Sequence, residues 1–210
     1  MCFHSQQQKS PQEIAKRFNF NIDNVPENVT GVFNGFDFPK TPVISNDDLN
    51  KVQLYDWGLI PSWSSDSDIR KFTLNAKIET LAQKPSFKDA INNRCLVLSS
   101  GFFEWQWRDS KGKEKRKYLI KPTQEEIFAF AGIWSEWTNP ETGEKQKTYS
   151  IITTEANELM SEIHNTKKRM PVILPKENEF DWLNAIPITE VMKFNPELEA
   201  TEITSAPRLF

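Results

Sequence analysis

The second residue of the chain, Cys2, could carry the most distinctive chemistry in the sequence. If Met1 is removed, Cys2 has a free α-amine beside its own thiol. Such a group can condense with an aldehyde through the amine and then close through the sulfur into a five-membered ring, whereas an internal cysteine cannot. The α-amine has a pKa of about 8, so roughly a tenth of it is neutral and nucleophilic at pH 7. The alternative is an accidental cysteine at a frayed terminus.

A carboxylate, Glu104, stands in a strongly aromatic segment, GFFEWQW. If this segment is a strand, Glu104 shares a face with Phe102 and Gln106 and lies opposite the tryptophans. Burial on that face would raise the pKa of the carboxyl group toward the range that is useful in proton transfer. The alternative is a glutamate on the solvated face of a half-buried strand.

Three further residues could bind or position a substrate. His164 comes at the end of an expected helix, where the helix dipole favours its protonated form, although a lone histidine at this position is more often a helix cap than a catalyst. Asn75 can donate and accept hydrogen bonds, and Lys77 can neutralise a phosphate. Any surface segment offers such groups, so the pair alone indicates little.

Composition sets limits on the remaining functions. The chain has 210 residues, of which 38% are hydrophobic and 26% charged, which predicts one globular domain over residues 1–210. No apolar run is long enough for a membrane span or a signal peptide, so we expect a cytoplasmic protein. Cys2 and Cys95 are too far apart for a disulfide framework or a metal motif, and we expect no metal and no cofactor.

The net charge of −3 argues against a generally basic nucleic-acid-coating protein but allows local basic patches. Lysines surround Gly112 between two strand-like runs, which is typical of a solvated hairpin tip. A second cluster, formed by Lys167, Lys168 and Arg169, follows His164 directly. There is neither a glycine-rich phosphate loop nor a Gly-x-Ser-x-Gly nucleophile turn.

The pattern of elements predicts an α+β fold that is rich in β-structure, with a curved, barrel-like, mainly antiparallel sheet and flanking helices. Ser10 begins a capping box ahead of a short helix. A second helix is expected over residues 85–92, and a third is expected to be capped by Thr154 and to end at His164. Strands are expected at residues 95–99, 102–107, 118–120, 127–134, 148–153 and 170–174, and a last short helix at 180–183.

An ordered series of motifs resembles the SOS response-associated peptidase family, whose members are also known as abasic-site processing proteins. The series is Cys2, WGLIPSW at 57–63, LNAKIET at 74–80, GFFEW at 101–105, AGIW at 131–134, and IH followed by RMPVIL at 163–174. The resemblance covers most of the chain, from Cys2 to about Trp182. No single motif would be specific, but the combination is.

The resemblance implies a channel for single-stranded DNA and a covalent thiazolidine between Cys2 and an abasic site. It implies that Cys2 is the nucleophile and that Asn75 positions the cysteine and the sugar. It also implies that Glu104 is the acid and base for the amine and iminium, and that His164 is the acid that helps to open the sugar ring. It also implies removal of the residue before Cys2, by self-cleavage or by ordinary methionine removal, and leaves open a lyase activity.

Lys77 and Arg169 are the expected phosphate contacts, with Trp63 stacking on bases and His4 at a further DNA contact. We expect Trp57, Trp105 and Trp134 to lie in the core.

The chain departs from the family pattern in three places. Family members commonly begin Cys-Gly-Arg, whereas His4 stands here in place of the arginine, which weakens a phosphate contact. Lys77 replaces an arginine after Asn-Ala, so a bidentate contact becomes a point charge. Four residues, 165–168, separate His164 from Arg169 where the family has one, which makes His164 the least secure of the assignments.

Three functions from different classes remain open. The first is a protein that crosslinks to abasic sites in single-stranded DNA and is associated with the nucleoid, acting as a monomer. The second is an N-terminal-nucleophile cysteine peptidase that acts on peptides in trans, with Glu104 or His164 as its base. The third is a binding module that holds single strands without chemistry, for which an intact sugar and an abasic one would bind alike.

Overall fold

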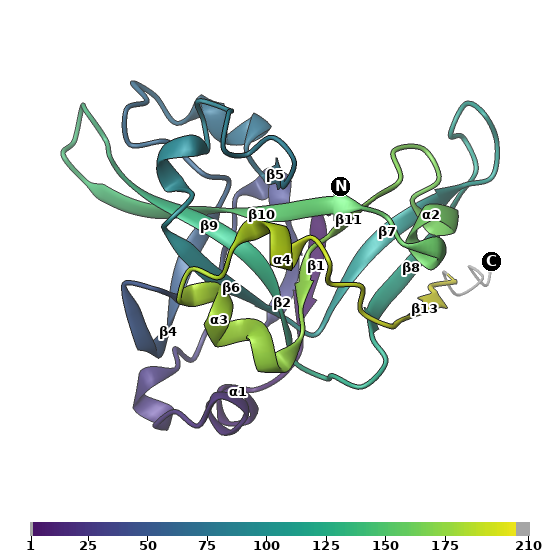
Figure 1. Ribbon diagram of the computed structural model, residues 1–210, viewed down its shortest axis with the longest axis horizontal. Coiled ribbons are helices and arrows are strands. Elements are labelled where there is room, and N and C mark those ends of the chain that lie inside the picture. Colours follow the sequence, from purple (N-terminus) through teal and green to yellow (C-terminus); the bar gives the residue numbers. More distant parts are fainter. Residues whose placement is uncertain (1, 205–210) are drawn as a thin grey trace, which may run out of the picture.

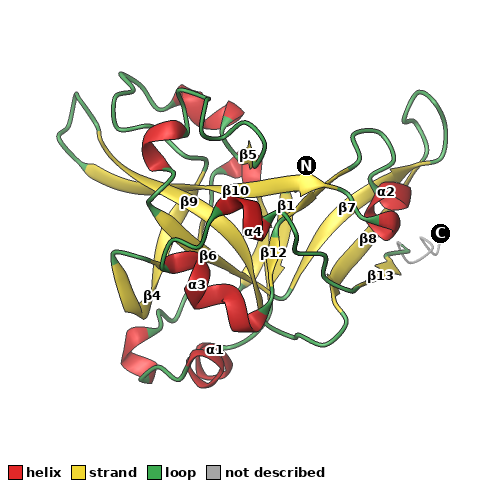
Figure 2. Cartoon of the chain, in the orientation of Figure 1, coloured by secondary structure: helices red, strands yellow, loops and turns green. Residues whose placement is uncertain are grey.

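The computed structural model describes residues 2–204, and Met1 and residues 205–210 lie outside the description. Within this range two curved, mainly antiparallel β-sheets form most of the molecule, with short helices at their flanks (Figures 1 and 2). This confirms the predicted β-rich α+β class. None of the described helices is long and apolar enough to cross a membrane.

The first sheet has five strands in the order β13-β8-β7-β1-β2, and each neighbouring pair is antiparallel. Its strands are β1 (His4–Gln7), β2 (Gly31–Asn34), β7 (Gly101–Trp107), β8 (Lys115–Pro122) and β13 (Leu198–Glu202). β7 and β8 form a hairpin in which Trp105 pairs with Lys117 and Glu104 pairs with Tyr118. The alternation predicted for the GFFEWQW segment is therefore present, with Glu104 and Phe102 on one face.

The second sheet has eight strands and is organised around one long strand, β10. Its strands are β3 (Lys40–Ser45), β4 (Asp48–Trp57), β5 (Asn75–Lys77), β6 (Arg94–Ser99), β9 (Phe128–Thr138), β10 (Lys145–Glu155), β11 (Arg169–Pro171) and β12 (Ile173–Leu174). β10 is antiparallel to β9 and β11 and parallel to β4 and β5. Its register places Asn75 opposite Ile151 and Arg169 opposite Glu155, so a single strand aligns both of these residues.

The helices are short. They are α1 (Pro11–Phe18), α2 (Glu158–Ile163), α3 (Glu179–Leu183) and α4 (Ile188–Val191), with single 3₁₀ turns at Ile22–Asn24, Gly35–Asp37, Asp68–Phe72, Lys88–Ala90 and Lys176–Asn178. The capping box predicted at Ser10 is present, since its side chain accepts from Glu13 N–H and the Glu13 carboxylate accepts from Ser10 N–H.

Two of the helix predictions are wrong in detail. Residues 85–92 form turns around the 3₁₀ segment at 88–90 and not a full helix. The cap of α2 is Asn157, whose side chain accepts from Met160 N–H, because Thr154 is still paired with Met170 of β11. The predicted strand at 170–174 is divided into β11 and β12 at Val172.

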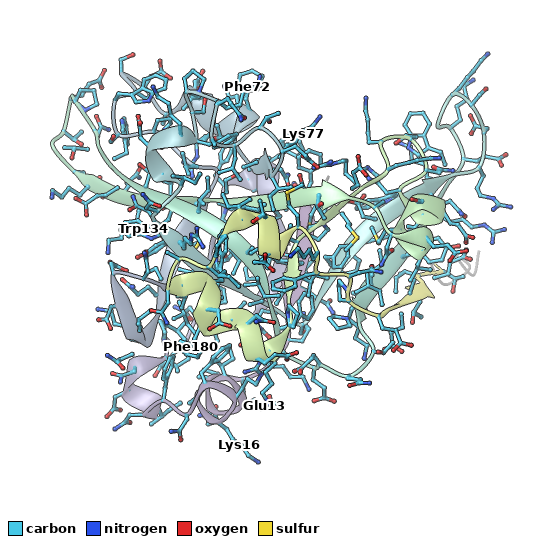
Figure 3. The ribbon with its side chains drawn as sticks, in the orientation of Figure 1. Glu13, Lys16, Phe72, Lys77, Trp134 and Phe180 are labelled. Atoms are coloured by element: carbon cyan, nitrogen blue, oxygen red, sulfur yellow. The ribbon has the colours of Figure 1, made fainter. Side chains whose placement is uncertain are left out.

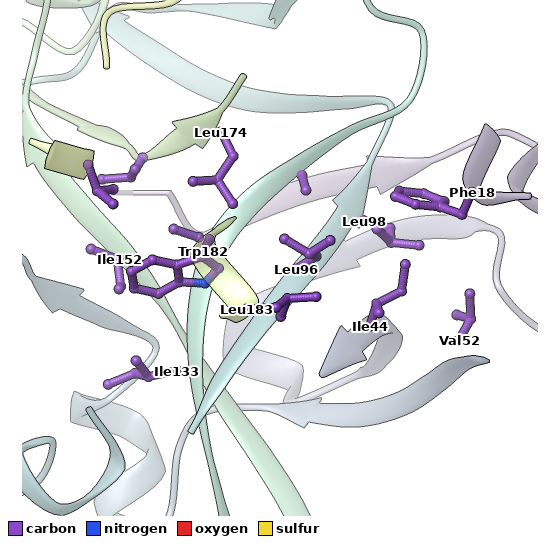
Figure 4. Close-up of a cluster of buried hydrophobic side chains, with 14 of the residues drawn as sticks. Phe18, Ile44, Val52, Leu96, Leu98, Ile133, Ile152, Leu174, Trp182 and Leu183 are labelled. Atoms are coloured by element: carbon purple, nitrogen blue, oxygen red, sulfur yellow. The ribbon is translucent and has the colours of Figure 1, made fainter. Parts of the chain in front are cut away.

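Two buried apolar clusters hold the sheets together. One packs α1 and α3 against the second sheet, and Trp182 is its largest side chain (Figure 4). The Trp182 indole donates to the Cys95 carbonyl, and the Arg94 guanidinium lies 4.1 Å from the centroid of its ring. The other cluster includes Cys2, Trp57, Phe102 and Ile163. It therefore joins the N-terminal segment to β4, β7 and α2. Of these elements, β7 contains Glu104 and α2 ends at His164.

Candidate active site around Cys2

Cys2 is fully buried against the second apolar cluster, just before β1. Its thiol lies 3.7 Å from the His4 carbonyl. Burial raises the pKa of the Cys2 thiol well above its usual range, and the nearby charge of Glu104 raises it further. The thiol is therefore protonated at neutral pH. The removal of Met1 concerns a residue outside the described range.

Asn75 is brought directly onto Cys2. Its side-chain amide nitrogen donates to the Cys2 carbonyl at 2.8 Å, from the first position of β5. Its side-chain oxygen is buried and accepts no hydrogen bond from any described residue. This oxygen is thus an available acceptor beside the backbone of Cys2.

Glu104 is also close to Cys2, because its negative charge raises the pKa of the Cys2 thiol. The side chain is only 6% exposed, and burial raises the pKa of the carboxyl group to about 7. Of the two predicted positions for Glu104, the structure therefore shows the buried face of the strand and not the solvated one. A carboxyl group with this pKa exchanges a proton readily at neutral pH, which suits general acid and base catalysis.

His164 lies at the C-terminal cap of α2, next to Ile163 of the same buried cluster. Its Nδ1 is 2.8 Å from the Arg169 carbonyl oxygen and 3.2 Å from Arg169 N–H. Burial lowers the pKa of His164 to about 4, so the ring is neutral at pH 7. The expectation that the helix end keeps it protonated is wrong, because the cost of burying the charge exceeds the favourable effect of the helix dipole.

The four residues predicted to contact DNA differ in exposure and in the faces they occupy. Lys77 is exposed at the end of β5 and forms no ion pair with a described residue (Figure 3). Trp63 is 54% exposed on the segment between β4 and β5, as predicted. His4 pairs with Phe103, so alternation puts it on the face of the first sheet opposite Glu104. Its ring lies edge-on to Trp105, with 4.7 Å between centroids.

Arg169 is already paired within the protein. Its two terminal nitrogens donate to the two carboxylate oxygens of Glu79 at 2.7 and 2.9 Å, and one of them also donates to the Thr153 carbonyl at 2.7 Å. Nε is buried and has no partner among the described residues. Arg169 could therefore contact a phosphate only through N–H groups that do not already bond to Glu79 or Thr153.

The sequence missed two exposed or half-exposed aromatic residues near the site. Phe72 is 83% exposed and stands three residues before Asn75, at the same edge as Lys77 in Figure 3. An apolar residue between Lys71 and Asn75 in a loop could have signalled it. Trp105, which we expected in the core, is half-buried between His4 and Lys117, whose Nζ lies 5.5 Å from the ring centroid. Trp134 is also only half-buried, whereas Trp57 is fully buried as expected.

No group of three or more His, Cys, Asp or Glu side chains in residues 2–204 could hold a metal ion. Cys2 and the buried carboxyl group of Glu104 suit nucleophilic attack with proton transfer.

Asn75 supplies a test of how the site is positioned. We expect Asn75→Ala to slow any reaction at Cys2 by about 10- to 100-fold, because the loss of one hydrogen bond of roughly 1 to 3 kcal/mol frees the Cys2 backbone. The single-turnover rate of the reaction measures this change. Unfolding by denaturant provides the control, since a merely structural role would lower stability and leave the rate of the folded protein unchanged.

The chain is similar to several proteins with curated names. It is 45% identical over 141 residues to the abasic site processing protein YoqW of Bacillus subtilis (strain 168), a match that covers 67% of this chain and 59% of that protein. It is 36% identical over 163 residues to the abasic site processing protein HMCES of Gallus gallus, covering 65% of this chain and 47% of the relative. The matches thus span about half the length of these relatives.

Solved structures share the fold. A crystal structure of a protein from Bacteroides thetaiotaomicron superposes with a TM-score of 0.85 at 36% identity and covers 97% of this chain and 92% of that one. A protein from Bordetella bronchiseptica shares the fold with a TM-score of 0.79 at 23% identity, covering 97% of this chain and 100% of that one. The family model for the SOS response associated peptidase (SRAP) matches residues 1–207. The chain therefore belongs to the SRAP family.

Proposed function

We propose that this protein processes abasic sites in single-stranded DNA by forming a covalent thiazolidine through Cys2, once Met1 has been removed. The observation that carries the proposal is the contact of Cys2 with Asn75 beside a buried glutamate whose pKa is about 7. The names of the relatives, which process abasic sites, support the same substrate.

The first half of the proposed reaction joins the amine to the sugar. An abasic deoxyribose in its open form is an aldehyde, and the neutral Cys2 amine attacks C1′. Glu104 accepts a proton from the nitrogen and returns one to the departing hydroxyl group, so that water leaves and an iminium forms. A carboxyl group with a pKa near 7 serves in both directions at neutral pH.

The second half closes the ring. The Cys2 thiol is protonated because it is buried, so its proton must pass to a base as the sulfur bonds to C1′. Glu104, as carboxylate, and the neutral His164 are the two candidate bases. The C1′–S bond forms, the iminium becomes an amine, and no external oxidant or reductant is consumed.

His164 has a further proposed role in opening the sugar ring. As a neutral imidazole it can accept the proton of the C1′ hydroxyl group while the C1′–O4′ bond breaks, and the imidazolium then returns this proton to O4′, which leaves the aldehyde and a free hydroxyl group. Direct protonation of O4′ by His164 as the initial acid requires that the bound DNA raise the pKa of the ring. Phosphates near His164 would have this effect, because a nearby negative charge favours the protonated ring.

Binding of the strand is assigned to exposed groups of the segment from Trp63 to Lys77. Lys77 would contact a phosphate, and Trp63 and Phe72 would stack on bases, which is worth about 1 to 3 kcal/mol per base and tolerates any sequence. When bound to such a strand, the protein would be associated with the nucleoid. Removal of Met1 by self-cleavage, and strand cleavage through the iminium, would be further activities of the same centre.

Peptide hydrolysis in trans is the weaker proposal. A cysteine peptidase needs a thiolate that a peptide can reach, whereas Cys2 is 0% exposed and its thiol pKa is raised. A small aldehyde at the end of a flexible sugar requires less room than a peptide bond.

Intact mass spectrometry tests the proposal. The protein is measured before and after incubation with a single-stranded oligonucleotide that carries one abasic site. We expect loss of Met1 and a stable adduct at the sum of the two masses less one water, localised to Cys2. A processed Cys2 terminus that gives no adduct would contradict the proposal and favour the peptidase or the simple binding module.

A further inference from the structure

We propose that residues 165–168, together with the turn of the β7–β8 hairpin, form a second phosphate-binding site, which holds the DNA backbone on one side of the abasic sugar. The inference rests on the proposed function. It concerns the four residues between His164 and Arg169, where this chain departs from the usual family pattern.

The 165–168 loop is fixed in place by its own hydrogen bonds. Lys168 N–H donates to the His164 carbonyl at 2.9 Å, and Lys168 adopts a left-handed conformation with φ of 49°. The Asn165 side chain donates to the Trp107 carbonyl at 2.9 Å and accepts from Trp107 N–H at 3.2 Å. Asn165 thereby pairs with the edge of β7 as a neighbouring strand would, which holds the loop against the hairpin.

The hairpin turn is fixed to the same residue. Gly112 has φ of 65°, and a Cβ at this position would lie only 2.6 Å from the Trp107 ring, so the turn folds closely over the indole. Lys115 Nζ lies 5.0 Å from the centroid of that ring. Trp107 therefore anchors both the loop and the turn, which lie side by side at the α2 end of the first sheet (Figure 1).

The two segments present lysines that the protein does not neutralise. Lys167 and Lys168 are exposed and form no ion pair with any described residue, and the same is true of Lys111 and Lys113 in the turn. Asp109, a carboxylate of the turn, is occupied by backbone N–H groups of the turn itself. Glu114 and Glu162 are the other acids close by, so the positive charges outnumber the negative ones.

This contrasts with the arginines nearby. Arg169 is held by Glu79, and Arg116 forms an ion pair with Glu202 at 3.1 Å. The lysines of the loop and the turn, together with Arg108 of the same hairpin, form no ion pair with a described residue and are available to a polyanion, as Lys77 is near Cys2.

The position of the site indicates which phosphates it would bind. Lys167 follows His164 by three residues, and its charge contributes to lowering the pKa of that histidine. Along β7, Trp107 is three residues from Glu104, or about 10 Å at the rise of a strand. The loop and the turn therefore lie away from Glu104 along β7, so they would bind a phosphate next to the reacting sugar and not the sugar itself.

Salt-dependent binding of the double variant K167Q/K168Q tests the inference. The probe is a single-stranded oligonucleotide with a tetrahydrofuran analogue of the abasic sugar, which lacks the aldehyde and so reports binding alone. We expect the slope of log K against log salt to fall by about 0.7 for each lost phosphate contact, or about 1.4 in total. The variant K167R/K168R should retain the slope of the wild type.

The matched control is K16Q/K176Q, which removes two exposed and unpaired lysines on the α1 side, where Figure 3 shows Lys16 far from Lys77. We expect a slope close to that of the wild type. An unchanged slope in K167Q/K168Q, or an equal fall in the control, would overturn the second site. Crosslinking of the wild type to an abasic oligonucleotide is measured in parallel, so failure of the proposed function appears separately as a missing adduct.

Discussion

Replacement of Cys2 by alanine is expected to abolish the denaturation-resistant adduct with an abasic oligonucleotide. Alanine keeps the α-amine, so the iminium can still form, but no sulfur is present to close the ring. The adduct should then survive denaturation only after reduction with borohydride. Denaturing gel electrophoresis with and without reductant separates the contribution of the amine from that of the thiol.

Cys95 provides the matched control for Cys2. It is the only other cysteine and is also fully buried, beneath Gly132 of β9. The Cys95→Ala variant should crosslink as the wild type does, after thermal unfolding has shown that it folds. If Cys2→Ala gives as much unreduced adduct as the wild type, the thiazolidine mechanism is wrong.

Replacement of Glu104 by glutamine is expected to slow adduct formation by about 10²- to 10⁴-fold, the usual contribution of a general acid or base. In the wild type the rate should change with pH around 7, where the Glu104 carboxyl group titrates. The variant should lack this inflection. Single-turnover rates between pH 5 and 9 measure both effects.

The same substitution should stabilise the protein at alkaline pH. Burial raises the Glu104 pKa from 4.5 to about 7, so the folded state prefers the protonated form and loses stability as the pH rises through this interval. Glutamine removes the buried charge. We expect the free energy of unfolding of Glu104→Gln at pH 8 to exceed that of the wild type by up to about 3 kcal/mol, and the two values to differ little at pH 4. Unfolding by denaturant at the two pH values measures this difference.

Glu179 is a matched control for both measurements. It is buried in α3, and burial raises its pKa to about 7 although Arg17 forms an ion pair with it at 2.9 Å. Glu179→Gln should alter the pH dependence of stability and leave the crosslinking rate unchanged. Equal slowing in the two variants would mean that Glu104 acts through stability and has no role in proton transfer.

Much of the fold could be predicted because its signals are local. The capping box at Ser10 and the alternation around Glu104 depend on neighbouring residues, and both are present in the structure. The cap of the helix before His164 was misplaced because Thr154 pairs with Met170 in another strand. Such a pairing depends on residues distant in the sequence and leaves no local pattern.

The same distinction between local signals and distant contacts applies to the candidate site. The contact of Asn75 with Cys2 follows from motifs that the sequence displays, although only the fold brings residues 73 positions apart together. The neutral state of His164 could not be predicted, because it depends on burial by other segments. The pairing of Glu79 with Arg169 was likewise hidden, since each residue alone looks like an exposed charge.

The register of β10 has a consequence for how the protein can change in evolution. β10 aligns Asn75 and Arg169 on its own backbone, and the His164 ring is hydrogen-bonded directly to the Arg169 backbone. Both ends of the 165–168 segment are therefore held by contacts outside it, and the segment can vary in length. Residues 165–168 thus form a loop that can be exchanged while His164 and Arg169 keep their positions. Exchange of this segment would change the charged surface next to the candidate site and leave the residues around Cys2 in place.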